Sequence, residues 1–187
     1  RVVTISRAKF SVTYPASFML IAAMNPCPCG YYNHPEKDCV CGPGIVQKYL
    51  NKISGPLLDR IDIHVEVVPV PFRELTSLRQ SEKSTAIRER VTRARQVQEE
   101  RYKDNKNIHC NAQMNTKMLR QICVITEEGH NLLKTAMEKL SLSARAYDRI
   151  LKVSRTIADL DNSPDIKTEH LAEAIHYRSL DRETWGG

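Results

Sequence analysis

The sequence predicts a mixed α/β segment followed by an all-α segment, and two observations support this prediction. Residues 2–68 contain stretches in which apolar and polar residues alternate, together with one continuous apolar run, as in β-strands. From about residue 81 onward, apolar residues recur at helical spacing, and the segments begin at Ser or Thr residues suited to helix N-caps. With 187 residues the chain is long enough for one domain and part of a second.

The strands are predicted in the first part of the chain. Residues 2–6 and 10–14 alternate around a short connection, which predicts a β-hairpin. Residues 18–24 (FMLIAAM) form a continuous apolar run of strand length, typical of a central strand covered on both faces. Residues 61–68 alternate Ile and Val with polar residues and predict a further strand, which the segment 68–72 closes.

Helices are predicted between and after these strands. Residues 44–53 place apolar side chains on one face of a short helix, and Pro56 can start a further helical turn. Residues 82–106 predict a long, highly charged helix whose apolar stripe is thin, so we expect it to pack lightly or to bridge two bodies. Four shorter helices are predicted at residues 116–122, 126–140, 143–160 and 168–178.

Charge and composition narrow the class of protein. The formal net charge of +6 and the pI of about 9.0 are compatible with a nucleic-acid or nucleotide partner, although many plain cytoplasmic proteins share them. No apolar run approaches the roughly 18 residues that a membrane span needs, and we expect no signal peptide. We therefore expect a cytoplasmic protein, and we interpret the start at Arg1, without Met, as that of a fragment.

Four of the 6 cysteines form a cluster with the pattern C-x-C, nine residues, C-x-C. Four thiolates satisfy the tetrahedral coordination of zinc and leave no open position for a catalytic water. The sequence therefore predicts a structural zinc site, with free thiols or disulfides as the alternatives. His34 is an alternative ligand in place of one sulfur, and a glycine follows each pair of cysteines and permits a tight turn. The predicted ligands are Cys27, Cys29, Cys39 and Cys41.

The other two cysteines stand apart from this cluster. Cys123 lies in the apolar run ICVI and is predicted to fill the core. Cys110 follows His109 in a polar stretch, where a simple loop thiol is favoured over a shared site.

Three polar residues are candidates for contact with a phosphate group or with an attacking water. Asn25 follows the apolar run 18–24, so it either orients a water or phosphate at a strand end or caps the turn before Pro26. Arg60 either pairs with a neighbouring aspartate or neutralises phosphate charge. Arg145 lies at a helix start, where the helix dipole disfavours a cation, which indicates either a functional use or a solvated surface position.

Three strings together resemble the Mg-chelatase-like AAA+ ATPases of the ComM (YifB) type: AAMNPCPCGYY, YLNKISGPLLDRIDIHVEV and LSARAYDRILKVSRTIADL. The resemblance implies that residues 1–72 are the second half of a three-layer, P-loop NTPase-like AAA+ core, with the four-cysteine insertion at 26–43. Residues 73–106 would be a linker and long insert helix, and residues 107–187 a C-terminal helical lid domain.

The same resemblance implies roles for the three polar residues. Asn25 would be sensor 1 and orient the attacking water, Arg60 would be the arginine finger, and Arg145 would be the sensor 2 arginine. The implied cofactor is ATP with Mg²⁺. The implied assembly is a hexameric ring that acts on DNA, driving branch migration in recombination or transformation.

Two other functions are weighed against this one. The first is a magnesium chelatase ATPase subunit, which shares the core but serves porphyrin metallation. The second is a zinc-stabilised DNA-binding module without a motor role, in which stacking and charge on the cysteine loop contact the nucleic acid. The residues that would make this contact are Tyr31, Tyr32, His34 and Lys37.

The nucleotide-gripping motifs of such an ATPase do not occur in these residues. The sequence contains no G-x-x-x-x-G-K-[ST] and no acidic strand end suited to Mg²⁺. We therefore expect those parts to lie upstream of Arg1, and we expect the fragment alone not to hydrolyse ATP.

Overall fold

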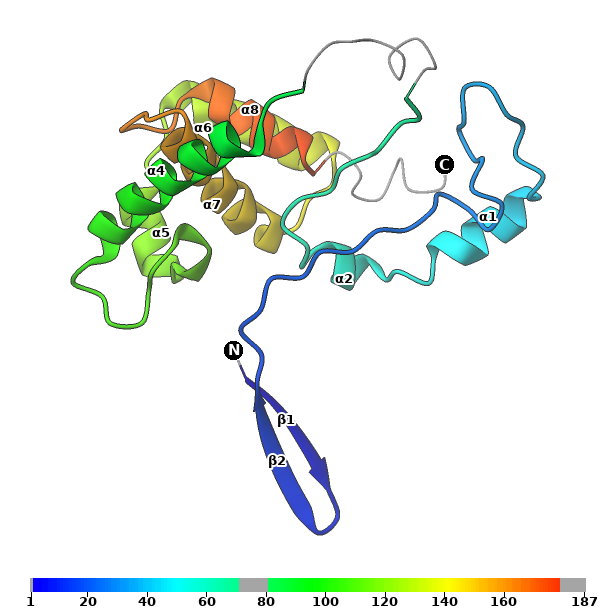
Figure 1. The fold of residues 1–187 in the computed structure, drawn as a ribbon, viewed down its shortest axis with the longest axis horizontal. Helices are drawn as coiled ribbons and strands as arrows, with labels where there is room; N and C mark the ends of the chain where they lie inside the picture. The colour runs from blue at the N-terminus through cyan, green and yellow to red at the C-terminus, as the bar shows by residue number, and fades with distance from the viewer. Residues whose placement is uncertain (1, 71–80, 179–187) are drawn as a thin grey trace.

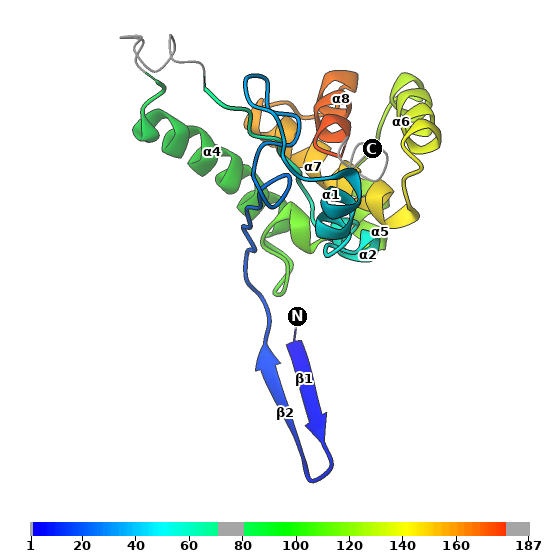
Figure 2. The same ribbon diagram turned by 90° about the vertical axis from the view of Figure 1, so that its right-hand side faces the viewer.

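The computed structural model describes residues 2–70 and 81–178. It begins with the hairpin of strands β1 (Val2–Arg7) and β2 (Phe10–Pro15), which confirms that prediction. The strands are antiparallel, with Val2 opposite Pro15 and Arg7 opposite Phe10. In Figures 1 and 2 the hairpin projects away from all of the helices.

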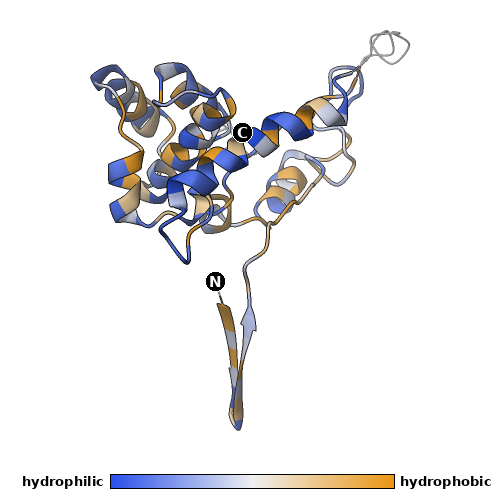
Figure 3. Ribbon diagram, turned by 60° about the vertical axis from the view of Figure 1, so that its left-hand side comes forward, coloured by the Kyte–Doolittle hydropathy of each residue, from blue (hydrophilic) through white to orange (hydrophobic). Residues whose placement is uncertain are grey.

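The two faces of the hairpin differ in chemistry. On one face the Thr4 and Thr13 hydroxyls lie 3.0 Å apart, and those of Ser6 and Ser11 lie 2.8 Å apart. The opposite face carries the apolar pairs Val3–Tyr14 and Ile5–Val12. All of these residues are exposed. Figure 3 shows hydrophobic colour along part of the projecting hairpin.

The strands predicted at residues 18–24 and 61–68 are not formed, so these two predictions are wrong for this structure. A strand needs a neighbour that accepts and donates its backbone hydrogen bonds. Within residues 2–70 and 81–178, only β1 and β2 pair. Both segments are consequently irregular and largely exposed, with Met19 82% and Val67 87% accessible, although Ile61 and His64 are partly buried. The predicted three-layer AAA+ core is therefore not confirmed.

Two short helices follow the cysteine loop. Helix α1 (Pro43–Leu50) and helix α2 (Gly55–Leu58) agree with the predicted helical segments. Each has a proline in its first turn, where the missing backbone N–H would have no partner in any case. Helix α1 buries Val46 and Leu50.

The second part of the chain is all helical, as predicted. It comprises α4 (Ser84–Tyr102), the 3₁₀ turn η1 (Asn111–Gln113), α5 (Thr116–Ile122), α6 (Glu127–Lys139), α7 (Ala144–Leu160) and α8 (Thr168–His176). Helix α7 packs against α4, α5, α8 and η1 and so lies at the centre of this helical domain. Its core includes Tyr102, Leu119, Leu133, Ile150 and Leu171.

The predicted N-caps are correct for two of the four shorter helices. The side chains of Thr126 and Ser143 accept from backbone N–H groups of α6 and α7. Helix α5 is instead capped by Asn115, because its amide oxygen accepts from the Met118 N–H at 3.0 Å. At α8, Lys167 takes the cap position and its N–H donates to His170 Nδ1 at 3.1 Å.

The long helix α4 packs along only part of its length. Ala94, Gln98 and Tyr102 are buried, whereas Ile87 and Val91 on the same stripe are exposed. This agrees with the light packing that the thin apolar stripe predicts. Within the described residues, no helix has the length and apolar character to span a membrane.

A buried polar network joins α4, η1 and α7. The carboxylate of Asp159, which is only 3% exposed, accepts from Arg101 at 2.8 Å, Arg155 at 3.1 Å and Asn111 at 2.8 Å. Arg155 also donates to the backbone carbonyl of Pro164 at 2.7 Å. Each buried charge therefore has a charged partner and further hydrogen bonds, which buried ions require.

Candidate functional site

The four clustered cysteines come together in the structure. The Sγ atom of Cys27 lies 3.3 Å from that of Cys29 and 3.7 Å from that of Cys39, and Cys29 lies 3.5 Å from Cys39. The ligand atoms of all four, Cys41 included, lie within 4.8 Å of one another. None is in a disulfide, for which the sulfurs would be about 2.05 Å apart.

A tight turn after the first pair creates this arrangement. Gly30 has a φ of +83°, where a side chain would be strained, and its N–H donates to the Cys27 carbonyl at 3.1 Å. The Tyr32 N–H then points back at the Cys27 sulfur at 3.4 Å. The predicted turn at Gly30 is thus confirmed, whereas Gly42 has an ordinary φ of −64° as the N-cap of α1.

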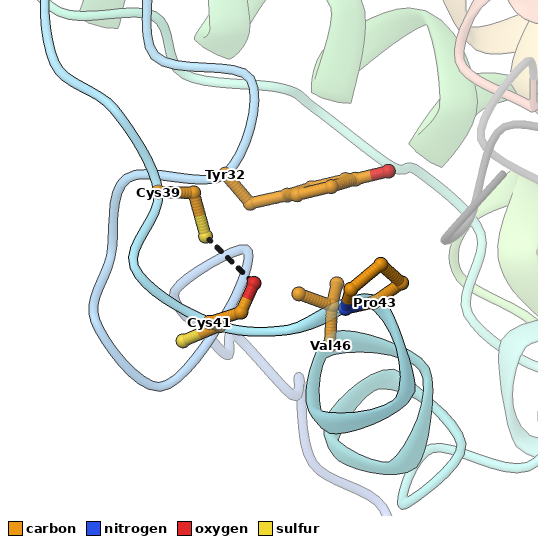
Figure 4. Close-up of a pocket in the computed structure, with 5 residues that line it drawn as sticks. All are labelled: Tyr32, Cys39, Cys41, Pro43 and Val46. Carbon is orange, nitrogen blue, oxygen red and sulfur yellow. Dashed lines mark hydrogen bonds between the residues drawn. The ribbon is translucent and has the colours of Figure 1, made fainter.

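The cysteine loop packs on helix α1. Cys27 is fully buried and forms a small apolar cluster with Val46 and Leu50. Figure 4 shows the pocket between loop and helix, with the Tyr32 ring on one side and Val46 below it. This contact was not predicted: the apolar face expected for residues 44–53 was that of Ile45, Tyr49 and Ile53, whereas the helix buries Val46 and Leu50 and leaves Ile45 57% exposed.

The thiols do not titrate alike. A backbone hydrogen bond from Tyr31 lowers the pKa of Cys29 to about 6, against the cost of desolvation. The backbone hydrogen bond at Cys41 favours ionisation of Cys39, but desolvation and the sulfurs of Cys29 and Cys27 raise its pKa to about 12. Closely held thiolates repel one another, so ionisation of all four is disfavoured without a cation between them.

These sulfurs fit a tetrahedral metal centre. Zinc–sulfur bonds of about 2.3 Å place neighbouring sulfurs of a tetrahedron about 3.8 Å apart. The three distances given above approach this value. His34 is not in the group, and its Nδ1 atom accepts from the Glu36 N–H at 3.1 Å. The four cysteines are therefore the residues that could hold a metal here.

The aromatic residues of the loop already have partners. The Lys37 ammonium lies 5.0 Å from the centroid of the Tyr31 ring, and His34 packs edge-on against that ring at 5.6 Å. Tyr32 is partly buried and packs against the cluster of Cys27, Val46 and Leu50. The predicted nucleic-acid contacts of these residues stay predictions.

Asn25 lies beside the cysteine loop. It is exposed, and its Nδ2 atom lies 4.0 Å from the position that a Cβ atom on Gly30 would take. Because residues 18–24 form no strand, the structure gives Asn25 no strand end to follow. Its predicted role as sensor 1 stays a prediction.

Arg60 and Arg145 are both exposed. Arg60 follows α2, and its guanidinium donates to the Pro56 carbonyl one turn earlier, rather than pairing with Asp59 or Asp62. Arg145 is the second residue of α7. No contact joins the two arginines, or either of them to Asn25, among the interactions of the described residues.

The segment after Arg60 is attached to the helical domain, which the sequence reasoning missed. Arg149, one turn after Arg145 on α7, forms an ion pair with Asp62. The His64 N–H donates to the Tyr177 carbonyl at 2.9 Å, and Arg178 donates to the Ile61 carbonyl. Only the opposite charges of Asp62 and Arg149 could have signalled this contact, and 87 residues separate them.

The other candidate cysteines and acidic residues that the structure describes are not assigned to a functional site. Burial raises the pKa of Cys123 to about 11 and its thiol donates to the Leu151 carbonyl, so the predicted core role is confirmed. Cys110 and His109 form no metal-binding group among the described residues. A trio of Asp161, Glu169 and His170 does converge near the start of α8. The Lys167 ammonium lies 3.6 Å and 3.3 Å from its two carboxylates and already supplies the balancing charge.

The comparison with protein families decides the membership of the chain. Residues 81–178 match the family described as magnesium chelatase, subunit ChlI C-terminal. Residues 1–75 match the one described as magnesium chelatase, subunit ChlI. The chain belongs to the magnesium chelatase family. The two matches cover the α/β and all-α segments that the sequence predicts, and they confirm the resemblance on which the predicted roles depend.

Individual relatives agree with this assignment. The chain is 41% identical over 181 residues to the competence protein ComM of Haemophilus influenzae and 41% identical over 179 residues to YifB of Escherichia coli. It is also 32% identical over 165 residues to an uncharacterized protein of Mycobacterium tuberculosis. The alignments cover 96%, 95% and 88% of this chain, but only 34%, 34% and 32% of the relatives. This magnesium chelatase family chain thus spans about a third of the length of these relatives.

Proposed function

We propose that this magnesium chelatase family chain supplies the arginine finger, sensor residues and helical lid of a ring-forming AAA+ ATPase that remodels DNA. The observation that carries the proposal is the family match along nearly the whole chain. The positions of Arg60 and Arg145 support it, because both guanidinium groups are exposed and can meet phosphate oxygens.

The chemistry asked of these residues is positioning and charge stabilisation. ATP with Mg²⁺, when bound, supplies the transferable phosphoryl group and neutralises part of its charge. Asn25 would orient the attacking water through its carboxamide. Arg60 would neutralise charge on the nucleotide of a neighbouring subunit, and Arg145 would report the nucleotide state to the helical domain through α7.

We favour DNA as the substrate on which the ATPase acts, because a relative named as a competence protein is 41% identical to this chain. A magnesium chelatase role in porphyrin metallation is the second candidate, and the family description supports it. A DNA-binding module without a motor is less well supported, because Tyr32 packs on the α1 cluster and Tyr31 faces Lys37 and His34.

The ATPase rate distinguishes these candidate functions. It is measured on the whole protein, which is taken to have the length of its relatives. We expect DNA to raise the rate, and branched DNA to raise it more than single-stranded or duplex DNA of equal length. A porphyrin with Mg²⁺ in place of DNA is the matched control and is expected to leave the rate unchanged. Stimulation by the porphyrin and not by DNA would support the second candidate and overturn the first.

We further propose that the four cysteines hold one structural zinc ion. The purified protein is expected to contain about one equivalent of zinc, because four thiolates complete its tetrahedral coordination. Replacing Cys27 and Cys39 by Ser is expected to remove the metal, while Cys110→Ser, outside the cluster, retains it. Metal analysis by mass spectrometry under reducing, chelator-free conditions measures both. A metal-free wild-type protein would refute the site.

A further inference from the structure

We infer that Asp62 and Arg149 are positioning residues that hold the segment following Arg60 against the helical domain, and so set where the exposed Arg60 guanidinium lies. The inference rests on the proposed function, because it takes Arg60 as the arginine finger and α7 as the helix that carries the nucleotide sensor. It adds a physical connection between the two within one subunit.

Three contacts attach the segment after Arg60 to the helical domain. The ion pair of Asp62 with Arg149 is the side-chain contact. The His64 N–H bonds to the Tyr177 carbonyl at 2.9 Å, just beyond the end of α8. The guanidinium of Arg178, which is buried, donates to the Ile61 carbonyl. Residues 61–64 thus lie on α7 and on the end of α8, and no strand pairs with them among the described residues.

Because of this attachment, the position of Arg60 depends on the position of α7. Arg60 precedes Asp62 by two residues, and Arg149 follows Arg145 by one helical turn, so Arg145 and Arg149 share a face of α7. A displacement of α7 that follows from nucleotide contact at Arg145 would therefore move Asp62 and the adjacent Arg60. The state of one nucleotide site would in this way set the position of the finger that serves the next site.

The ion pair contributes little to the stability of the fold. The Arg149 and Asp62 side chains are 28% and 56% exposed, and ion pairs this accessible to water have small stabilising effects. Removing either partner should leave the helical core intact, because Arg149 is not among its members. Catalysis is more sensitive, because a misplacement of about 1 Å can lower a rate by about a hundredfold.

The test measures steady-state ATPase kinetics of the whole protein with four variants of the ion pair and one control variant. Asp62→Ala and Arg149→Ala are each expected to lower kcat about ten- to a hundredfold with little change in KM. The double variant should be no worse than either single variant, because both remove the same contact. The charge exchange, Asp62→Arg with Arg149→Asp, should restore part of kcat. Arg120→Ala, an exposed arginine on α5, is the matched control.

Hydrogen exchange gives a second readout that does not depend on catalysis. The His64 amide is expected to exchange faster in Arg149→Ala than in the wild type, because its bond to Tyr177 depends on the same attachment. Unchanged exchange, unchanged kcat in the single variants, or additive losses in the double variant would each overturn the positioning role. A wild-type protein without ATPase activity would instead refute the proposed function, so the two failures are distinguishable.

Discussion

Replacing Arg60 by Ala in the whole protein is expected to lower the ATPase rate by about 10³-fold or more, because an arginine finger stabilises the charge that develops on the transferred phosphoryl group. Nucleotide binding should be largely retained, since the proposed finger would act on the nucleotide of a neighbouring subunit. Folding should also be retained, because the Arg60 side chain is exposed and its hydrogen bond is to the local Pro56 carbonyl. Steady-state hydrolysis and nucleotide titration measure the two effects.

Two further variants test whether the effect is specific to the guanidinium of Arg60. Arg60→Lys keeps the charge but loses the planar donor pair of guanidinium, so it should restore little of the rate. Arg120→Ala removes an exposed arginine elsewhere and should hydrolyse ATP at the wild-type rate. Loss of nucleotide binding by Arg60→Ala in assembled rings would argue against the finger role.

The largest effect on stability is expected at Asp159. Asp159→Ala should lower the free energy of unfolding by about 3–5 kcal/mol, because it leaves the buried Arg155 and the partly buried Arg101 without their carboxylate. Asn111 also loses an acceptor. Denaturant unfolding followed by circular dichroism measures the change. For comparison, Glu82→Ala breaks an exposed arginine–carboxylate pair with Arg90 and should cost about 1 kcal/mol or less.

The pH dependence of stability provides a separate check on Asp159. Burial opposes its ionisation, but the hydrogen bond from Arg101 and those of its other partners outweigh burial, so its pKa is lowered on folding. A depressed pKa stabilises the fold above the unfolded value of about 3.9, and this stabilisation is lost as the pH falls through the folded value. Acid unfolding should therefore begin below about pH 4 in the wild type. In Asp159→Asn this part of the dependence should be absent, and an unchanged acid profile would contradict the network.

The sequence predicts the local elements of this protein better than its sheet. The helices predicted at 126–140 and 143–160 were predictable because their Thr126 and Ser143 caps and their apolar spacing are local signals. The strands at 18–24 and 61–68 depend on neighbours elsewhere in a sheet, so no local pattern can guarantee them. The chain spans about a third of its relatives' length, and these runs have no partner strand among the described residues.

In the candidate site, too, local features were predictable from the sequence and long-range contacts were not. The spacing of the four cysteines predicted their convergence, because two short pairs joined by a turn can close on one ion. The packing of Cys27 on Val46 and the pairing of Asp62 with Arg149 join segments that no short motif links. Such contacts require the tertiary structure, and they are what connects the cysteine loop to α1 and the Arg60 segment to α7.

The most direct test of the central claim mixes two inactive variants of the whole protein. In the proposed mechanism, Asn25→Ala would disable the subunit's own nucleotide site, whereas Arg60→Ala would disable only the contribution to a neighbour. If Arg60 acts across a subunit interface, rings assembled from both variants contain some sites with an intact Asn25 and an intact Arg60. We predict that the mixture regains ATPase activity that neither variant has alone, and a mixture as inactive as its components would contradict the account.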